Sequence, residues 1–113
     1  MERAKKIATP LKRPNASVMG MVENIVGCKW SLTVLSLVRA GVKRPGAMEH
    51  AVEGLSAKVL NERLKKLVRF GILNKKSYAE IPPRMEYRLT AFGKKFGALV
   101  DQIEVLERER SAR

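Results

Sequence analysis

The side chains of residues 56–65 have the types and spacing needed to contact the bases and phosphates of a nucleic-acid duplex. Leucines at 60, 64 and 67 mark the inner face of a helix, so positions 58, 61, 62 and 65 share its outer face. Asn61 can pair with an adenine edge, Glu62 can accept from a cytosine amine, and Lys58 can reach guanine or phosphate. The candidate contact residues on this helix are Ser56, Lys58, Asn61, Glu62, Arg63 and Lys65.

Within this set, Ser56 at the helix start is placed for a phosphate, and Arg63 and Lys65 are assigned to the nucleic-acid backbone. The alternative interpretation of each residue is an ordinary solvated helix face.

A second basic cluster lies where the apolar period changes from helical to alternating. Met85, Tyr87 and Leu89 alternate with charged residues, which predicts a half-buried strand, and residues 72–79 are expected to be its antiparallel partner. The intervening segment 80–84 contains two adjacent prolines and is expected to be a loop or strand edge. A basic hairpin tip can lie along phosphates or in a minor groove. The candidate residues there are Lys75, Lys76, Ser77 and Arg84, with Tyr78 either a contact or a packing residue.

The charge of the chain is concentrated in the same region. Of a formal net charge of +12, residues 56–94 carry +7 and residues 1–14 carry +4, while residues 95–113 are neutral. A localised positive field attracts polyanions and makes binding salt-dependent, whereas solubility alone does not require such localisation. Residues 1–14 are interpreted as a flexible basic arm that either follows the adjacent groove or is an inert tail.

The elements that position these side chains follow from apolar spacing and caps. Helices are expected from residue 15 or 17 to 26, from 30 to just before Gly41, over 45–52 and over 56–70. The last two, joined by a three-residue turn containing Gly54, form a helix-turn-helix pattern that the hairpin directly follows. The predicted fold is mainly α-helical with a small β-hairpin (α+β), a winged helix-turn-helix. We expect residues 15–113 to form one domain after the arm, for DNA binding and dimerisation.

The final helix, which Thr90 can cap, carries apolar residues at steps of four and three. This spacing is a heptad seam over about two repeats, which a symmetric partner could bury. Packing against the chain's own core is the alternative. The residues assigned to a homodimer interface are Phe92, Phe96, Leu99, Ile103 and Leu106, and the charged end from 107 to 113 is expected to fray.

Few other residues suggest chemistry. Cys28, the only cysteine, lies beside Lys29 and is either a small apolar residue or a thiol that senses oxidants or electrophiles. Trp30 is assigned to the core, and His50 has no second ligand at metal spacing. We therefore expect no metal, no cofactor and no enzyme. No signal peptide or membrane-spanning run is found, and the single cysteine suits the reducing cytoplasm.

Three segments resemble the HxlR-type winged helix regulators, relatives of the MarR type. They are Gly27-Cys28-Lys29-Trp30, the segment from Leu55 to Gly71, and most specifically Ile81-Pro82-Pro83-Arg84-Met85-Glu86-Tyr87-Arg88-Leu89-Thr90 followed by Gly93. The resemblance covers residues 17–106 and implies a dimeric, DNA-binding transcriptional regulator, often a repressor. It also implies a dimer interface built from the first and last helices.

Two positions depart from the family pattern. Ser17-Val18 stand where some members carry a redox-sensing Cys-Pro pair, so that thiol switch is absent. Arg44-Pro45 replace the usual Arg-Phe before the third helix, which puts the packing of this corner in question.

Together these features predict a homodimer that binds double-stranded DNA at a pseudo-palindromic operator and regulates transcription, probing two major grooves one turn apart. An unidentified small-molecule effector is a further candidate partner. The alternative is a winged-helix module that binds protein or RNA without operator specificity. The low aromatic content of 5% argues against base stacking on RNA.

Overall fold

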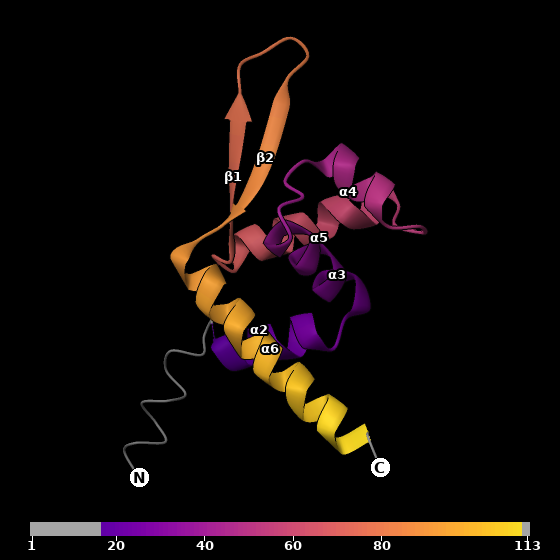
Figure 1. Cartoon of the computed structure of the whole chain (residues 1–113). Helices are drawn as coiled ribbons and strands as arrows, with labels where there is room; N and C mark the ends of the chain where they lie inside the picture. The colour runs from indigo at the N-terminus through magenta and orange to yellow at the C-terminus, as the bar shows by residue number, and fades with distance from the viewer. Residues whose placement is uncertain (1–16, 112–113) are drawn as a thin grey trace, which may run out of the picture.

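The computed structural model describes residues 17–111, so the arm predicted at residues 1–14 lies outside the described residues. Within residues 17–111, five helices and one hairpin follow in the order α2 (Val18–Val26), α3 (Lys29–Arg39), α4 (Pro45–Ala51), α5 (Ala57–Arg69), β1 (Leu73–Tyr78), β2 (Arg84–Leu89) and α6 (Ala91–Ser111). Figure 1 shows the hairpin projecting from the helical part, away from the C-terminal end of α6. The predicted winged helix-turn-helix fold is confirmed.

Short-range capping fixes where the helices begin. Ser17 accepts from the amide of Gly20 at 2.9 Å, and Ser56 accepts from the amide of Val59 at 3.2 Å. Thr90 accepts from the amide of Gly93 at 2.8 Å before α6. The cap at Thr90 was predicted, and residue 17 was one of two predicted starts of the first helix. In each case a hydroxyl just before an apolar helical repeat satisfies a free backbone donor.

Two predicted boundaries differ from the structure. The turn between α4 and α5 spans residues 52–56, longer than the predicted three residues, because α4 stops at Ala51 and Val52 is already extended. At the other end, α6 continues to Ser111 where fraying was expected from 107.

The hairpin is antiparallel, with Lys75 opposite Tyr87 and Ser77 opposite Met85. Arg84, predicted in the loop, is the first residue of β2 and pairs with Tyr78. Two hydrogen bonds hold the hairpin in place, one to the segment between α3 and α4 and one between its own two ends. The Tyr87 amide donates to the carbonyl of Lys43 at 2.9 Å, and the Thr90 hydroxyl donates to the carbonyl of Gly71 at 2.6 Å.

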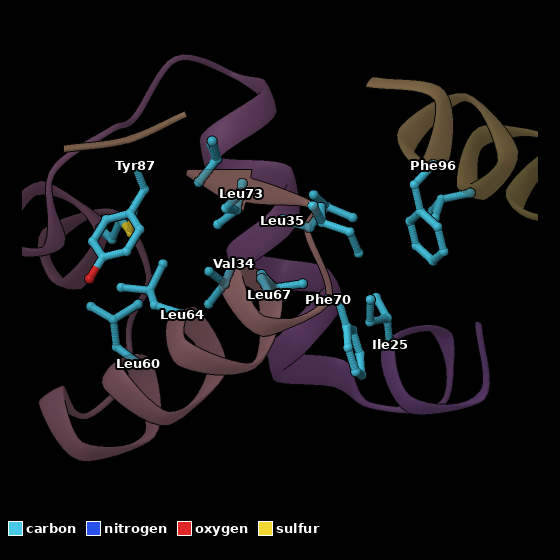
Figure 2. Packing of buried hydrophobic residues seen from close by; sticks show 14 of the residues in the cluster. Ile25, Val34, Leu35, Leu60, Leu64, Leu67, Phe70, Leu73, Tyr87 and Phe96 are labelled. Carbon is cyan, nitrogen blue, oxygen red and sulfur yellow. The ribbon is translucent and has the colours of Figure 1, made fainter. Parts of the chain in front are cut away.

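The core lies where α2, α3, α5, the hairpin and the start of α6 meet (Figure 2). Leu60, Leu64 and Leu67 of α5 are fully buried there, as the leucine spacing predicted. Trp30 is half-buried and packs against this core. Burying these side chains holds α5 with its polar face outward.

No single helix within residues 17–111 is long and apolar enough to cross a membrane. The pair α2 and α3, bent by 100° at their junction, meets that test only when the two are taken together, by length and composition.

Candidate nucleic-acid interface

The outward face of α5 carries most of the predicted contact residues. Ser56, Lys58, Asn61, Glu62 and Lys65 are all exposed, on the side opposite the buried leucines. This is the geometry of a helix that can enter a major groove with its polar side chains toward the base edges.

Arg63 lies apart from this set. Its side chain is half-buried, its Nε finds no hydrogen-bond partner among the described residues, and its nearest carboxylate is Glu62 at 3.8 Å. The charge of Arg63 acts on Cys28 at the start of α3. Arg63 is therefore less exposed than the other predicted contact residues of α5, and its charge acts at the α2–α3 junction, whereas the sequence assigned it to phosphates.

Residues of the hairpin alternate between two faces, and this divides the predicted wing residues. Lys75 and Ser77 share one face with their partners Tyr87 and Met85. Lys76 and Arg84 fall on the opposite face. Because Lys75, Met85 and Tyr87 line a groove together with residues of α5, the first face is the one turned toward that helix.

Arg84 is held within a cluster on the second face. Its guanidinium lies 3.8 Å from the ring centroid of Tyr78 and within ion-pair distance of Glu80 at 3.3 Å and Glu86 at 3.7 Å. The hydrogen bond from Arg88, together with the charges of Arg84, Arg88 and Lys43, lowers the pKa of Glu86. Tyr78 and Arg84 thus contact each other and stiffen the hairpin.

Other cations on α5 and the hairpin differ from Arg84 in their distance from carboxylates. Within residues 17–111 no carboxylate lies at ion-pair distance from five of them: Lys58, Lys65, Arg69, Lys75 and Lys76. Their charge is therefore not neutralised by a carboxylate of the described residues and is available to a polyanion.

Arg69, Met85 and Ile81 were not predicted as site residues. Arg69 lies one helical turn after Lys65, so the i, i+4 spacing could have revealed it. Ile81 is fully exposed at the hairpin turn, and Met85 is 38% exposed on the face toward α5. Alternation alone could not show that Met85 lies beside α5.

One residue of the predicted α6 seam is not on the outer face of the helix. Phe96 is 2% exposed and packs in the core of its own chain, with its ring 6.2 Å from that of Phe92. The other seam residues reach solvent: Phe92 at 36%, Leu99 at 39% and Leu106 at 61% exposed, with Ile103 half-buried. An apolar strip therefore remains uncovered along α6.

Cys28 lies at the start of α3 and is half-buried. Burial by itself raises the pKa of its thiol, but the polar groups of Ser31, the charge of Arg63 and the backbone of Trp30 outweigh burial and lower it to about 7. No group of three His, Cys, Asp or Glu side chains in residues 17–111 is arranged to hold a metal ion.

Comparison with known sequences gives consistent matches. A family model described as HxlR-like helix-turn-helix matches residues 25–112. An uncharacterized HTH-type transcriptional regulator of Synechocystis is 42% identical over 81 residues, which cover 72% of this chain and 57% of that protein. The chain thus matches little more than half the length of that relative. YtfH of Escherichia coli, of the same description, is 34% identical over 71% of this chain and 67% of its own length.

Solved structures agree in fold. A protein described as a MarR-family transcriptional regulator from Porphyromonas gingivalis superposes with a TM-score of 0.64 at 33% identity, over 79% of this chain and 87% of that one. The regulator YtcD gives a TM-score of 0.72 over 86% of this chain and 99% of its own, at 22% identity, which supports the fold alone.

Proposed function

The chain belongs to the HxlR-like helix-turn-helix family of transcriptional regulators, and from that premise we propose that it represses transcription as a homodimer bound to a pseudo-palindromic operator. In this proposal α5 enters the major groove and the hairpin lies against the adjacent phosphates or minor groove. In this proposal the protein acts on double-stranded DNA in the cytoplasm, and a small-molecule effector modulates it.

The observation that carries the proposal is the exposed polar face of α5 beside cations that no carboxylate of residues 17–111 neutralises. Asn61 and Glu62 supply groups that can read base edges, because amide and carboxylate side chains pair with adenine and cytosine. Lys58, Lys65 and Lys75 supply positive charge around them. Charge-neutralising contacts give affinity, and base contacts give sequence preference.

The homodimer is proposed from the apolar strip on α6. Phe92, Leu99 and Leu106 recur every seven residues and are at least one third exposed. A two-fold partner using the same strip would remove this surface from water and place two α5 helices on one duplex. Half-sites are then expected about 34 Å apart, one turn of DNA.

The test is a binding series on duplexes selected from random sequence by the purified protein. Asn61→Ala and Glu62→Ala should reduce preference for the selected duplex over a scrambled one, by about 1–3 kcal/mol per lost base contact. Lys75→Gln should weaken both duplexes by the same factor and reduce the salt dependence. Lys95→Gln, an exposed lysine on α6, is the matched charge control.

Single-stranded DNA, duplex RNA and single-stranded RNA of the same sequence complete the series. Preference for duplex DNA supports the proposal. Equal or tighter binding to RNA, or no binding to any nucleic acid, would contradict it and favour the alternative of an RNA- or protein-binding module.

A further inference from the structure

Three arginines meet at one carboxylate on the hairpin face turned away from α5. Oε1 of Glu86 lies 3.1 Å from Nη2 of Arg88, and Oε2 lies 3.7 Å from Nε of Arg84. Both arginines share this face with Glu86 because side chains alternate along β2. Nε of Arg44, from the segment between α3 and α4, lies 3.9 Å from Oε2. These four residues are the Glu86 cluster.

The carboxylate of the cluster is covered, while two of its arginines are not. The side chain of Glu86 is 13% exposed, whereas those of Arg44 and Arg88 are 55% and 53% exposed. The hydroxyl of Tyr78 also donates to Oε1 of Glu86 at 3.4 Å. The arginines therefore surround a carboxylate that has little contact with water.

One carboxylate serves more positive charge than it can balance. Within residues 17–111, Glu86 is the only carboxylate at ion-pair distance from Arg44 or Arg88. The hydrogen bond from Arg88 lowers the pKa of Glu86, and the charge of Lys43 acts in the same direction. Glu86 is therefore ionised at neutral pH and attracts each of the arginines around it.

The lysines of the hairpin are placed differently. Lys75 and Lys76 are exposed, and in the described part of the chain neither has a carboxylate at ion-pair distance. The hairpin region thus carries two kinds of cation, free lysines and arginines held at Glu86. Because phosphate contacts give affinity for DNA of any sequence, the number of free cations sets how strongly the protein holds unrelated DNA.

We propose that Glu86 is a positioning residue that withholds the three arginines of the cluster from phosphates and so limits the sequence-independent affinity of the protein for DNA. To reach a phosphate, a guanidinium must leave the carboxylate. A phosphate that approaches the cluster also meets the negative charge of Glu86. The inference rests on the proposed function, because it concerns how strongly the same protein surface holds duplex DNA.

The sign of one effect distinguishes this role from a structural one. If the cluster only stiffened the hairpin, loss of the Glu86 charge would loosen the hairpin and weaken DNA binding. If Glu86 withholds the arginines, loss of its charge frees cations and strengthens DNA binding, more so at low salt.

The experiment measures the affinity of wild-type protein and Glu86→Gln for the selected and scrambled duplexes at several salt concentrations. Glu86→Gln removes the charge and nearly keeps the side-chain size. It should tighten both duplexes by one shared factor, about fivefold to tenfold near 0.1 M salt for each phosphate gained, and steepen the slope of log affinity against log salt by about 1 for each.

Glu109→Gln is the matched charge control. Glu109 is an exposed residue of α6 and lies outside ion-pair distance of every cation in residues 17–111. The substitution makes the same change in net charge and should alter neither affinity nor slope.

Arg88→Gln tests an arginine of the cluster and does not depend on the stability of the Glu86 variant. In the wild-type background Arg88 is held, so this substitution should leave the slope unchanged, whereas Lys75→Gln lowers it. In the Glu86→Gln background, Arg88→Gln should remove part of the gained affinity and slope, because the two residues are coupled. Thermal unfolding of each variant establishes that it is folded.

The outcomes separate this inference from the proposed function. Unchanged or weaker binding by folded Glu86→Gln would overturn the role of Glu86, and so would a lowered slope for Arg88→Gln alone. Both measurements can be made on the scrambled duplex, so a wild-type protein without sequence preference would refute the operator and still allow this test. A wild-type protein that binds no duplex would refute both proposals.

Discussion

Arg39 and Asp101 form a bidentate ion pair across the molecule, with Nη1–Oδ1 and Nη2–Oδ2 distances of 2.9 and 2.7 Å. The pair joins α3 to α6, which are far apart in the sequence. Gly97 leaves room for the Arg39 side chain beside α6, because a Cβ at position 97 would lie 2.7 Å from Nε of Arg39. The direction of α6, and with it the proposed dimer strip, therefore depends on a side chain of α3.

The first prediction concerns the pH dependence of this pair. The hydrogen bond from Arg39 lowers the pKa of Asp101. The stabilisation that the ion pair gives to the fold is therefore complete above the ordinary carboxyl pKa of about 3.9. It disappears as the pH falls through the lowered pKa of Asp101. Wild-type protein should melt above Asp101→Asn at neutral pH, and the two melting temperatures should converge in acid. A gap that persists below the lowered pKa would contradict this.

The second prediction concerns Gly93, where α6 passes closest to the turn before β1. A Cβ at this position would overlap the carbonyl oxygen of Ile72, a backbone atom that cannot move aside alone. Gly93→Ala should lower the free energy of unfolding by about 1–3 kcal/mol in chemical denaturation.

Gly46 provides the matched control for Gly93. It lies in α4 with no atom within 4 Å of an added Cβ, so Gly46→Ala should be neutral or stabilise by up to about 1 kcal/mol. Equal effects of the two substitutions would show that α6 does not approach Ile72 as closely as described.

The third prediction concerns Cys28, retained as a candidate redox-responsive residue. With a pKa of about 7, its alkylation by iodoacetamide should reach half its maximal rate near that pH, and Arg63→Gln should move the midpoint upward. Since folding lowers this pKa, stability should rise with pH between about 7 and the ordinary thiol value. The chain has one cysteine, so a single mass shift reports it. A midpoint equal to that of the denatured protein would refute the prediction.

The fourth prediction concerns the strip on α6. Leu99→Lys should weaken the dimer about tenfold or more, because an unpaired ammonium in an apolar contact costs at least about 1–3 kcal/mol. Analytical ultracentrifugation over a dilution series measures this. Ala98→Lys adds the same charge at an exposed position about 100° around the helix and should leave association unchanged. A wild-type chain that is monomeric at all concentrations would rule out the interface.

Much of the fold could be predicted because its signals are local. Ser17, Ser56 and Thr90 cap helices through donors three residues away, and the α5 leucines repeat within one helix. The site was predicted less completely, because pairing between distant segments decides it. Arg63 and Arg84 belong to basic runs in the sequence, yet Arg63 is half-buried with its charge acting on Cys28, and Arg84 packs on Tyr78.

Phe96 is another residue whose surroundings depend on contacts between distant segments. Its spacing fits the α6 seam, but the approach of α6 to the turn before β1 at Gly93 directs it into the core. A heptad pattern identifies apolar positions without saying which of two neighbouring surfaces will cover them.

The hydrogen bonds at the base of the hairpin also affect the entropy of association. The Tyr87 amide is bonded to the carbonyl of Lys43 and ties β2 to the segment between α3 and α4. Thr90 is bonded to Gly71 and ties the two ends of the β-ribbon together, so the ribbon is held before a duplex arrives. A freely swinging ribbon would lose about 1–2 kcal/mol for each residue that became ordered on binding. An anchored ribbon is preorganised and loses far less, so more of its contact energy contributes to affinity.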